Sequence, residues 1–254
     1  MKNILLTVEY DGTLFVGWQR QPGQRSVQGE LEKGLALLFD KPIELLASSR
    51  TDAGVHAYGQ KTNFIADFPM PVAKIRQAIN GFLPSDVIIT QAEEVPLEFH
   101  ARFSAIGKRY VYKIIRADDR RIFDRNYALT VTRSLDVEAM KTAAQYFIGT
   151  HDFKAFCGNN GQINKNTERT IHSMTVSLQP QNAVHIEVVG NAFLYKMVRM
   201  MTGSLLNIGY GKNPPEAIGQ ILEGKMKRIG NTAKPQGLYL VEVYFDQEKL
   251  RRTL

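Results

Sequence analysis

The sequence lacks several features that would define its class. Its 254 residues include one cysteine, Cys157, which excludes an internal disulfide and a thiolate zinc cluster and fits a reducing compartment. No run of about 18 apolar residues is present, so no membrane-spanning helix is predicted. The apolar run near the N-terminus is broken by Glu9 and Asp11 and is too short for a signal peptide. We therefore expect a cytoplasmic protein.

Sequence patterns for cofactors and metals are also missing. No Gly-x-Gly-x-x-Gly turn follows an expected strand, so the usual dinucleotide-type phosphate turn is not indicated. His56 is a possible ligand, but no Asp-x-Asp run or paired His–Cys spacing accompanies it. The sequence therefore predicts neither a metal site nor a bound cofactor.

The composition is that of a soluble globular protein with a basic balance. Hydrophobic residues make up 44% of the chain and charged residues 22%. The 32 Lys and Arg against 25 Asp and Glu give a formal net charge of +7, which favours a polyanionic partner such as nucleic acid. Many basic proteins bind no nucleic acid, so charge alone leaves the partner open.

The periodicity of apolar residues predicts an α+β fold in two halves, residues 1–104 and 105–254. Each half reads strand, helix, strand, strand, helix, strand, which is the order of the ferredoxin-like split βαβ unit. We expect two antiparallel sheets with a cleft between the halves. Strands are expected at 4–9, 43–47, 61–65, 87–90, 108–116, 171–178, 184–189 and 238–245, and helices along apolar stripes at 27–38, 72–82, 137–147 and 194–208.

The strongest chemical signal is the string Ser-Ser-Arg-Thr-Asp-Ala-Gly-Val-His at residues 48–56. Asp52 follows an apolar, strand-like run, with Arg50 two residues before it and Gly54 two residues after it. A guanidinium in reach of such a carboxylate keeps it ionised in a pocket drier than water. Thr-Asp-Ala-Gly alone is also an ordinary Asx turn, so these residues by themselves leave catalysis and a simple turn as alternatives.

Further segments accompany this string along almost the whole chain. They are Tyr10–Thr13 with Gly17–Gln19, Ser26–Glu32, Phe99–Ala105, Lys108–Tyr112, His151–Phe153, Phe193–Arg199 and Thr232–Leu238. In this order, and together with residues 49–57, they resemble the bacterial tRNA pseudouridine synthase A (TruA) family.

The resemblance implies an isomerase that converts uridine to pseudouridine in tRNA. The reaction breaks the bond from ribose to uracil N1, turns the base, and rejoins it through C5, so it needs no redox change and no cofactor. Asp52 is implied to be the nucleophile, acting on a base flipped into the cleft. A homodimer that modifies uridines 38, 39 and 40 of the anticodon stem-loop is also implied. Attack at C6, attack at C1′ and removal of a ribose proton remain alternatives for Asp52.

Two arginines are candidate partners of the Asp52 carboxylate. Arg199 lies beside Val198, at the edge of the apolar stripe of the last expected long helix, and Arg50 lies in the motif itself. The resemblance favours Arg199 as the partner, with Arg50 contacting the substrate nearer the RNA backbone. From the pattern alone, each also fits a solvated surface charge.

Tyr110 and Tyr112 share one face of an expected strand, among basic residues. A tyrosine ring there can stack on an extruded uracil and its hydroxyl can meet a proton, but both residues also fit a core. The resemblance assigns Tyr110 to the site and Leu194 to an apolar wall for the base, and it leaves Tyr112 ambiguous. Phosphate contacts are expected from basic residues that flank the motifs, namely Arg20, Arg25, His56, Arg102, Lys108, Arg109 and Lys196.

Two other functions compete with the isomerase. A non-catalytic RNA-binding protein would explain aromatic residues on a strand, but an acid such as Asp52 at its RNA surface would repel phosphate. A uracil methyltransferase would use Cys157 as its nucleophile, but it needs a methyl donor. The Gly- and Asn-rich surroundings of Cys157 also offer no evident base to lower the pKa of its thiol. The sequence therefore favours the isomerase.

Overall fold

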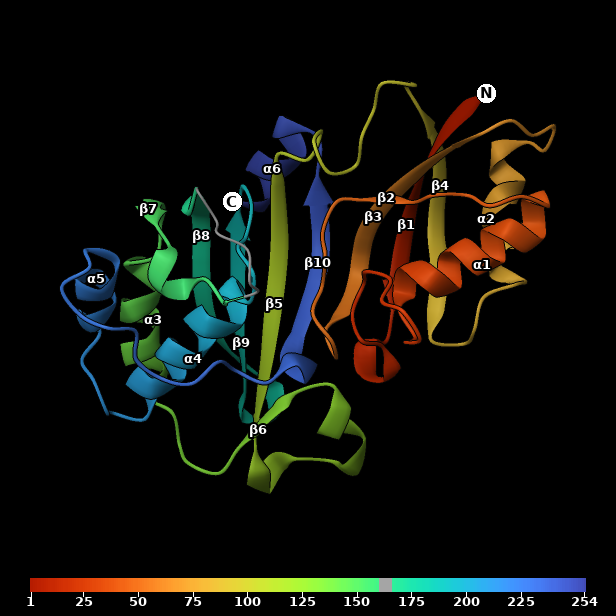
Figure 1. Ribbon diagram of the computed structural model, residues 1–254. Coiled ribbons are helices and arrows are strands. Elements are labelled where there is room, and N and C mark those ends of the chain that lie inside the picture. Colours follow the sequence, from red (N-terminus) through yellow and green to blue (C-terminus); the bar gives the residue numbers. More distant parts are fainter. Residues whose placement is uncertain (160–165) are drawn as a thin grey trace. The chain divides into compact units, whose positions relative to one another are not determined.

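The computed structural model describes residues 1–159 and 166–254. It is a mixed α and β structure with mostly antiparallel strand pairing. The chain divides into two compact units (Figure 1), here called the first and the second unit. The first unit comprises residues 1–106 and 239–245, and the second comprises residues 107–238 and 246–254.

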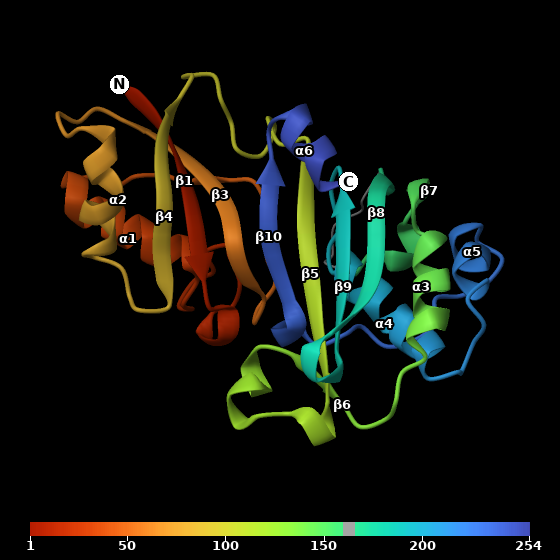
Figure 2. The same cartoon turned by 180° about the vertical axis from the view of Figure 1, so that it is seen from behind.

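The first unit is a sheet with helices on one face. Its strands are β1 (Lys2–Tyr10), β2 (Leu46–Ala47), β3 (His56–Ala66), β4 (Val87–Val95) and, by its residues from 239 onward, β10 (Leu238–Tyr244). β1 pairs antiparallel with both β3 and β4, β2 pairs antiparallel with β3, and β10 runs parallel to β3. The helices α1 (Val27–Phe39) and α2 (Val72–Asn80) cover one face, and Figure 2 shows the opposite face.

The second unit has the same layered construction. Its strands are β5 (Gly107–Arg116), β6 (Leu129–Val131), β7 (Gly149–Asp152), β8 (Glu168–Gln179) and β9 (Ala183–Gly190), and its helices are α3 (Val137–Gln145), α4 (Met197–Gly209), α5 (Ala217–Leu222) and α6 (Gln247–Thr253). The antiparallel order is β5-β9-β8-β7, with β6 parallel to β5. Helices α3 and α4 pack against each other on one face of this sheet (Figure 1).

Local sequence signals explain where several elements begin. The hydroxyl of Ser26 accepts a hydrogen bond from the Gly29 N–H at 3.2 Å, so Ser26 caps the N-terminus of α1, as serine commonly does. The apolar stripe that follows is buried at Val27, Leu31 and Leu35. Period-two burial on β5 also agrees with the sequence, because Tyr110, Tyr112 and Ile114 are all buried.

The expected strand 43–47 is shorter than predicted. Only Leu46–Ala47 form β2. Ile43 and Leu45 are buried, but the Leu45 N–H donates to the Glu32 carboxylate on α1 at 3.2 Å instead of entering a ladder. An apolar run therefore packs in the core here without forming a strand.

Two helix boundaries also differ from the prediction. The helix expected at 137–147 is shorter than predicted, because α3 ends at Gln145, and Gly149, with φ +112°, begins β7. The last long helix begins at Met197, not near Leu194, because Lys196 has the left-handed backbone (φ +58°) that an α-helix cannot continue through.

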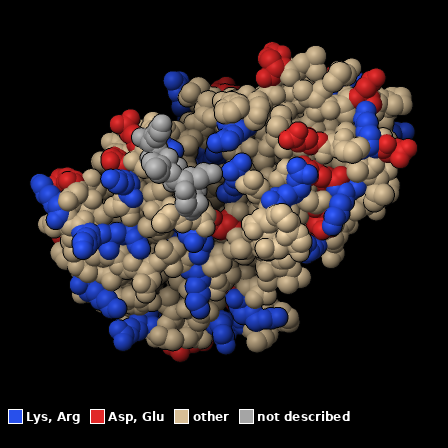
Figure 3. All heavy atoms as spheres, viewed as in Figure 1, with Lys and Arg blue, Asp and Glu red and all other residues tan. Residues whose placement is uncertain are grey.

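The two units carry opposite formal charge. The second unit has 22 Lys and Arg against 12 Asp and Glu, whereas the first has 10 against 13. On the face drawn in Figure 3, Lys and Arg side chains accordingly gather over the second unit. The excess of positive charge that favours a polyanionic partner therefore lies in the second unit. In the part of the chain that the structure describes, no helix is long and apolar enough to cross a membrane.

The segment before β10 packs tightly on α4. A Cβ at Gly203 would lie 1.7 Å from the carbonyl oxygen of Asn231, and the neighbouring Ser204 hydroxyl donates to the Ile229 carbonyl at 2.6 Å. A Cβ on Gly230, whose φ is +73°, would lie 2.2 Å from the Gly203 carbonyl oxygen. Glycines at 203 and 230 thus allow helix and segment to touch backbone to backbone.

Gly203→Ala is expected to lower the free energy of unfolding by about 1–3 kcal/mol, because the added methyl group overlaps a backbone carbonyl that cannot turn away. Urea denaturation followed by circular dichroism measures the change. Gly81→Ala is the matched control, since its Cβ would meet its nearest atom at 3.4 Å, an ordinary contact. Equal stability of the two variants would contradict the inferred close packing.

Candidate active site

Asp52 lies in a tight turn between β2 and β3. The Val55 N–H donates to the Asp52 carbonyl at 3.2 Å, and Gly54 takes the third position of the turn with φ +75°. That position of a type II turn requires a positive φ, so glycine is the residue that fits. The Asp52 side chain is half-buried. The motif found in the sequence therefore forms a turn, and this turn positions the half-buried carboxylate of Asp52.

The residue before Asp52 is held by the N-terminal segment. The buried hydroxyls of Thr51 and Tyr10 lie 2.7 Å apart in a hydrogen bond, and the Trp18 N–H donates to the Thr51 carbonyl at 3.1 Å. Trp18 itself is buried beside Tyr10. These contacts explain why Tyr10–Thr13 and Gly17–Gln19 accompany the Asp52 string in the sequence.

Glycines bring the same two segments into backbone contact. Gly17 and Asp52 form an antiparallel bridge, and a Cβ on Gly17 would lie 2.6 Å from the Thr51 carbonyl oxygen. Its φ of +114° is unfavourable for any side chain. A Cβ on Gly12 would lie 2.0 Å from the Val55 carbonyl oxygen. No residue larger than glycine fits either position without moving the Asp52 turn.

A buried glutamine, which the sequence analysis did not single out, supports the start of the motif. The Ser48 hydroxyl donates to Gln60 Oε1 at 2.9 Å, and Gln60 Nε2 donates to the Ser49 carbonyl at 2.8 Å. Gln60 is completely buried on β3. The only sequence signal for its role is a polar residue at a core-facing strand position, which becomes visible once the strand is known.

His56, predicted to contact phosphate, lies in the interior of the first unit with 2% of its surface exposed. Its Nδ1 accepts the Gly12 N–H at 3.1 Å, and its ring stacks on Tyr239 with centroids 4.7 Å apart. Asp11 Oδ1 also lies 3.2 Å from Nδ1, a contact that becomes an ion pair only if Nδ1 carries a proton. A phosphate would have to displace these partners to reach the ring.

The arginines predicted in the first unit have different surroundings. Arg50 and Arg102 are exposed. Arg20 forms an ion pair with Glu32 at 3.0 Å. Arg25 makes two hydrogen bonds to Asp86, at 2.6 and 2.8 Å, which raise the pKa of Arg25. Arg20 is exposed as well, so the half-buried Arg25 is the least accessible of the four.

In the second unit, two tyrosines of β5 have different environments. Tyr110 is buried with its ring edge-to-face to that of Phe193, centroids 5.1 Å apart, and Leu194, which follows Phe193 in the sequence, is also buried. Tyr112 is fully buried and its hydroxyl donates to the Lys234 carbonyl at 2.6 Å. Burial raises the pKa of Tyr112 well above its usual range. Tyr112, which the sequence left ambiguous, is therefore a neutral core residue.

Arg199 is anchored to the segment that precedes β10. Its Nε donates to the Ala233 carbonyl at 2.8 Å, and the Ala233 N–H donates back to the Arg199 carbonyl at 3.0 Å. This two-way contact fixes the direction of the half-buried guanidinium. It also gives the segment Thr232–Leu238 a structural role, which the sequence analysis did not identify.

The remaining predicted phosphate contacts also lie in the second unit. Lys108 and Arg109 lie near the start of β5, both half-buried, and Arg109 pairs with Glu187 of β9 at 3.4 Å. Lys196, just before α4, lies over the ring of Tyr195 at 4.9 Å. Leu194 directly follows Phe193, whose ring contacts Tyr110, and Lys196 follows two residues later.

Comparison with known proteins defines the class. A model of the tRNA pseudouridine synthase family matches residues 6–104 and 143–246, and the chain belongs to this family. It is 44% identical over 246 residues to tRNA pseudouridine synthase A of Ruminiclostridium cellulolyticum, covering 96% of this chain and all of that one. It is 42% identical to tRNA pseudouridine synthase A of Acetivibrio thermocellus, again covering 96% of this chain and all of that one. It is 43% identical to tRNA pseudouridine synthase A of Geobacter sp., covering 97% of this chain and all of that one. The family resemblance inferred from the sequence is confirmed.

Gly17→Ala is expected to reduce the rate of pseudouridine formation by about tenfold or more, because the new methyl group pushes the Thr51 carbonyl and displaces Asp52. The rate is measured on tRNA below the unfolding temperature of the variant. Gly23→Ala is the matched control: it also has a positive φ, +70°, but no atom lies within 4 Å of its Cβ. A normal rate in a folded Gly17→Ala protein would argue against this positioning role.

Proposed function

We propose that this chain isomerises uridines in the anticodon stem-loop of tRNA, at positions 38, 39 and 40, with Asp52 as the nucleophile. The observation that carries the proposal is the Asp52 turn, a half-buried carboxylate held by Tyr10, Trp18 and two glycines. Such support is what a reacting group needs, since small displacements cost large factors in rate. A surface carboxylate without a function would not need these supporting contacts.

The chemistry requires a carboxylate and a proton route. The bond between ribose C1′ and uracil N1 breaks, the base turns, a bond forms from C1′ to C5, and the C5 proton leaves while N1 gains one. Product and substrate have the same atoms and oxidation state, so no co-reactant is consumed. Asp52 supplies the electron pair that stabilises the detached fragment, by attack at C6 or C1′ or by taking a ribose proton.

Residues of the second unit complete this proposal. Tyr110 stacks on the flipped uracil and its hydroxyl takes part in moving the C5 proton, while Leu194 provides an apolar wall for the base. Arg199 pairs with Asp52 and keeps it ionised. The support for this pairing is that the hydrogen bond from Arg199 Nε to the Ala233 carbonyl fixes the direction of the guanidinium. Arg50 contacts the substrate nearer the RNA backbone, in keeping with its exposure.

RNA binding follows the distribution of charge. We propose that the phosphate contacts are made by exposed and half-exposed basic residues, with the positively charged second unit supplying the larger share. Of the predicted contacts, His56 would need the largest rearrangement because of its burial. The predicted set comprises Arg20, Arg25, His56, Arg102, Lys108, Arg109 and Lys196.

We further propose that each half is a ferredoxin-like split βαβ unit, with a cleft between the halves. Support comes from the antiparallel order β4-β1-β3 with β2 on β3. It also comes from the order β5-β9-β8, with α3 between β6 and β7 and α4 after β9. In this proposal residues 1–104 carry the catalytic aspartate and residues 105–254 complete the site. The working form is a cytoplasmic homodimer that needs no cofactor.

Asp52→Asn is expected to abolish turnover and leave tRNA binding largely intact, because it keeps the side-chain shape and removes the charge and the nucleophile. Release of tritium from uracil C5 of tRNA, without added methyl donor, measures turnover, and filter binding measures affinity. Asp40→Asn, the same change at an exposed carboxylate of the first unit, should react normally, since Asn tolerates its left-handed backbone. Measurable pseudouridine formation by Asp52→Asn would refute the assignment.

Two substitutions separate stacking from proton transfer at Tyr110. Tyr110→Phe keeps a ring worth about 1–3 kcal/mol of base stacking and loses only the hydroxyl, whereas Tyr110→Leu loses both. We expect the Phe variant to bind tRNA normally but to turn over slowly, and the Leu variant to be impaired in both. If Phe turns over at the wild-type rate while C5 deprotonation is rate-limiting, Tyr110 acts by stacking alone.

A further inference from the structure

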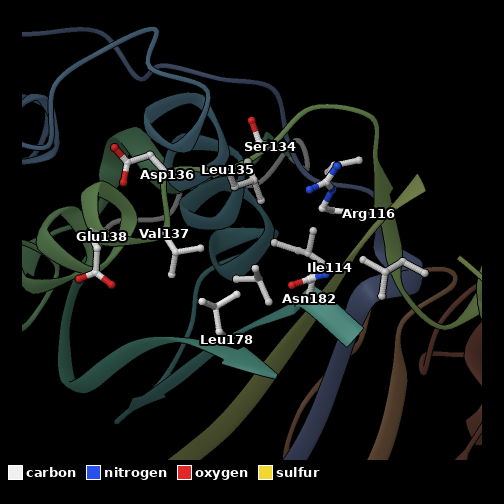
Figure 4. Close-up of a pocket in the computed structure, with 12 residues that line it drawn as sticks. Ile114, Arg116, Ser134, Leu135, Asp136, Val137, Glu138, Leu178 and Asn182 are labelled. Atoms are coloured by element: carbon white, nitrogen blue, oxygen red, sulfur yellow. The ribbon is translucent and has the colours of Figure 1, made fainter. Parts of the chain in front are cut away.

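Charged and polar groups without a part in the proposed chemistry occur in both units. In the second unit they lie on the rim of an apolar pocket of about 350 Å³, with Asp136 and Glu138 on one side and Arg116 on the other (Figure 4). Each of these three side chains already has a partner within the chain. The buried His56 of the first unit is different, because its contacts lead directly to the Asp52 turn.

His56 lies where the Asp52 turn ends and β3 begins. Only 2% of its surface is exposed, so it offers almost no surface to an RNA phosphate. A buried polar side chain is retained in a fold when its hydrogen bonds are made inside the protein. The contacts of the imidazole within the first unit therefore indicate what His56 does.

The main contact of the ring is a hydrogen bond from the backbone. The Gly12 N–H donates to His56 Nδ1 at 3.1 Å. Gly12 is buried, and a buried N–H that loses its acceptor destabilises the local structure. A ring nitrogen that accepts a hydrogen bond carries no proton, so the proton of this neutral imidazole is on Nε2.

A carboxylate lies near the same nitrogen but does not need a proton from it. Asp11 Oδ1 is 3.2 Å from His56 Nδ1. The same oxygen accepts the Thr13 N–H at 2.9 Å and the Thr13 hydroxyl at 2.5 Å, as the cap of the short 3-10 helix Gly12–Leu14. Because Asp11 Oδ1 has these two donors, Nδ1 can remain the acceptor for Gly12.

The direction of Nδ1 is set by a ring of β10. The imidazole stacks on Tyr239 with centroids 4.7 Å apart and 21° between the ring planes, and the two residues are paired across the parallel strands β3 and β10. Tyr239 in turn stacks on Tyr58 at 5.1 Å. These contacts orient the lone pair of Nδ1 within the folded unit.

Gly12 connects His56 to the Asp52 turn. A Cβ on Gly12 would lie 2.0 Å from the Val55 carbonyl oxygen, so the two main chains are in direct contact. The Val55 N–H closes the turn by donating to the Asp52 carbonyl at 3.2 Å. A shift of Gly12 therefore displaces the turn that carries the carboxylate.

We propose that His56 is a positioning residue for the reaction: its neutral Nδ1 holds Gly12, and Gly12 holds the end of the Asp52 turn. Gln60, on the same strand, holds the start of the motif, so two side chains of β3 fasten it at both ends. The inference rests on the proposed function, in which Asp52 reacts. Since small displacements of a reacting group cost large factors in rate, loss of the acceptor lowers turnover rather than RNA affinity.

Two substitutions separate the acceptor from the ring. His56→Phe keeps the ring and its stacking but has a C–H in place of Nδ1, whereas His56→Asn loses the ring and keeps an acceptor oxygen in the δ position. In the tritium-release assay, His56→Phe should lower kcat about tenfold or more and leave KM within about twofold of the wild type. His56→Asn should restore most of the kcat that His56→Phe loses.

His100 supplies the matched control. Its Nδ1 also accepts a backbone N–H, that of Arg102, at 3.1 Å, in a turn of the first unit that follows β4. His100→Phe removes the same kind of hydrogen bond at a distance in sequence from the Asp52 motif. It should leave kcat at the wild-type value.

Hydrogen exchange of the Gly12 amide, followed by NMR on the full chain without RNA, tests the hydrogen bond itself. The amide should be protected in the wild type and in His56→Asn, and should exchange about tenfold or more faster in His56→Phe. Circular dichroism checks the fold. If His56→Phe does not fold, His56→Leu takes its place, because it also lacks the acceptor and has a smaller side chain.

Three results would overturn the inference. A wild-type kcat together with rapid Gly12 exchange in the variant without the acceptor would make the bond structural only. Equal losses of tRNA affinity in His56→Phe and His56→Asn, with the salt dependence of binding reduced by about one unit of slope, would make His56 a phosphate contact. Both results leave the proposed function standing. A wild type that releases no tritium would overturn the proposed function and, with it, this role.

Discussion

The backbone contact between residues 10–18 and the Asp52 turn is the constraint on which the candidate site depends. Gly17 and Gly12 have no Cβ, so two chain segments approach closely enough for direct bonding between their main chains. The buried hydrogen bond from Tyr10 to Thr51 then fixes the register of this contact. A buried polar pair is costly to break, because either partner alone would be left unsatisfied. The carboxylate thus gains a defined position from groups that take no part in chemistry.

In the second unit, close backbone contact at glycines likewise positions Arg199. Gly203 and Gly230 let the segment before β10 lie directly on α4, and Ala233 then exchanges two hydrogen bonds with Arg199. An arginine side chain is long and flexible, so it loses much entropy when it is ordered. Anchoring Nε to a backbone carbonyl meets part of that cost within the folded unit, before any substrate binds. Both candidate catalytic side chains are therefore positioned by close backbone packing at glycines.

The two units differ in charge, and this difference matches the different roles proposed for them. The first unit carries the aspartate and a small negative balance, and the second carries the whole excess of positive charge. The positive charge that can attract RNA over a distance therefore lies in one unit, and the carboxylate of the proposed chemistry lies in the other.

The sequence by itself determined the family, the mixed α and β class and most elements, because apolar periodicity, helix capping at Ser26 and the 48–56 string are local signals. It also singled out Asp52 and its glycine turn. Tertiary structure decided the rest: that Ile43–Leu45 pack without a ladder, that His56 and Tyr112 are interior, and that Gln60 and Ala233 hold the site. These properties depend on which distant segments meet. A polar residue on a strand reads the same in the sequence whether it meets water or a buried carbonyl, and only the packed fold supplies that partner.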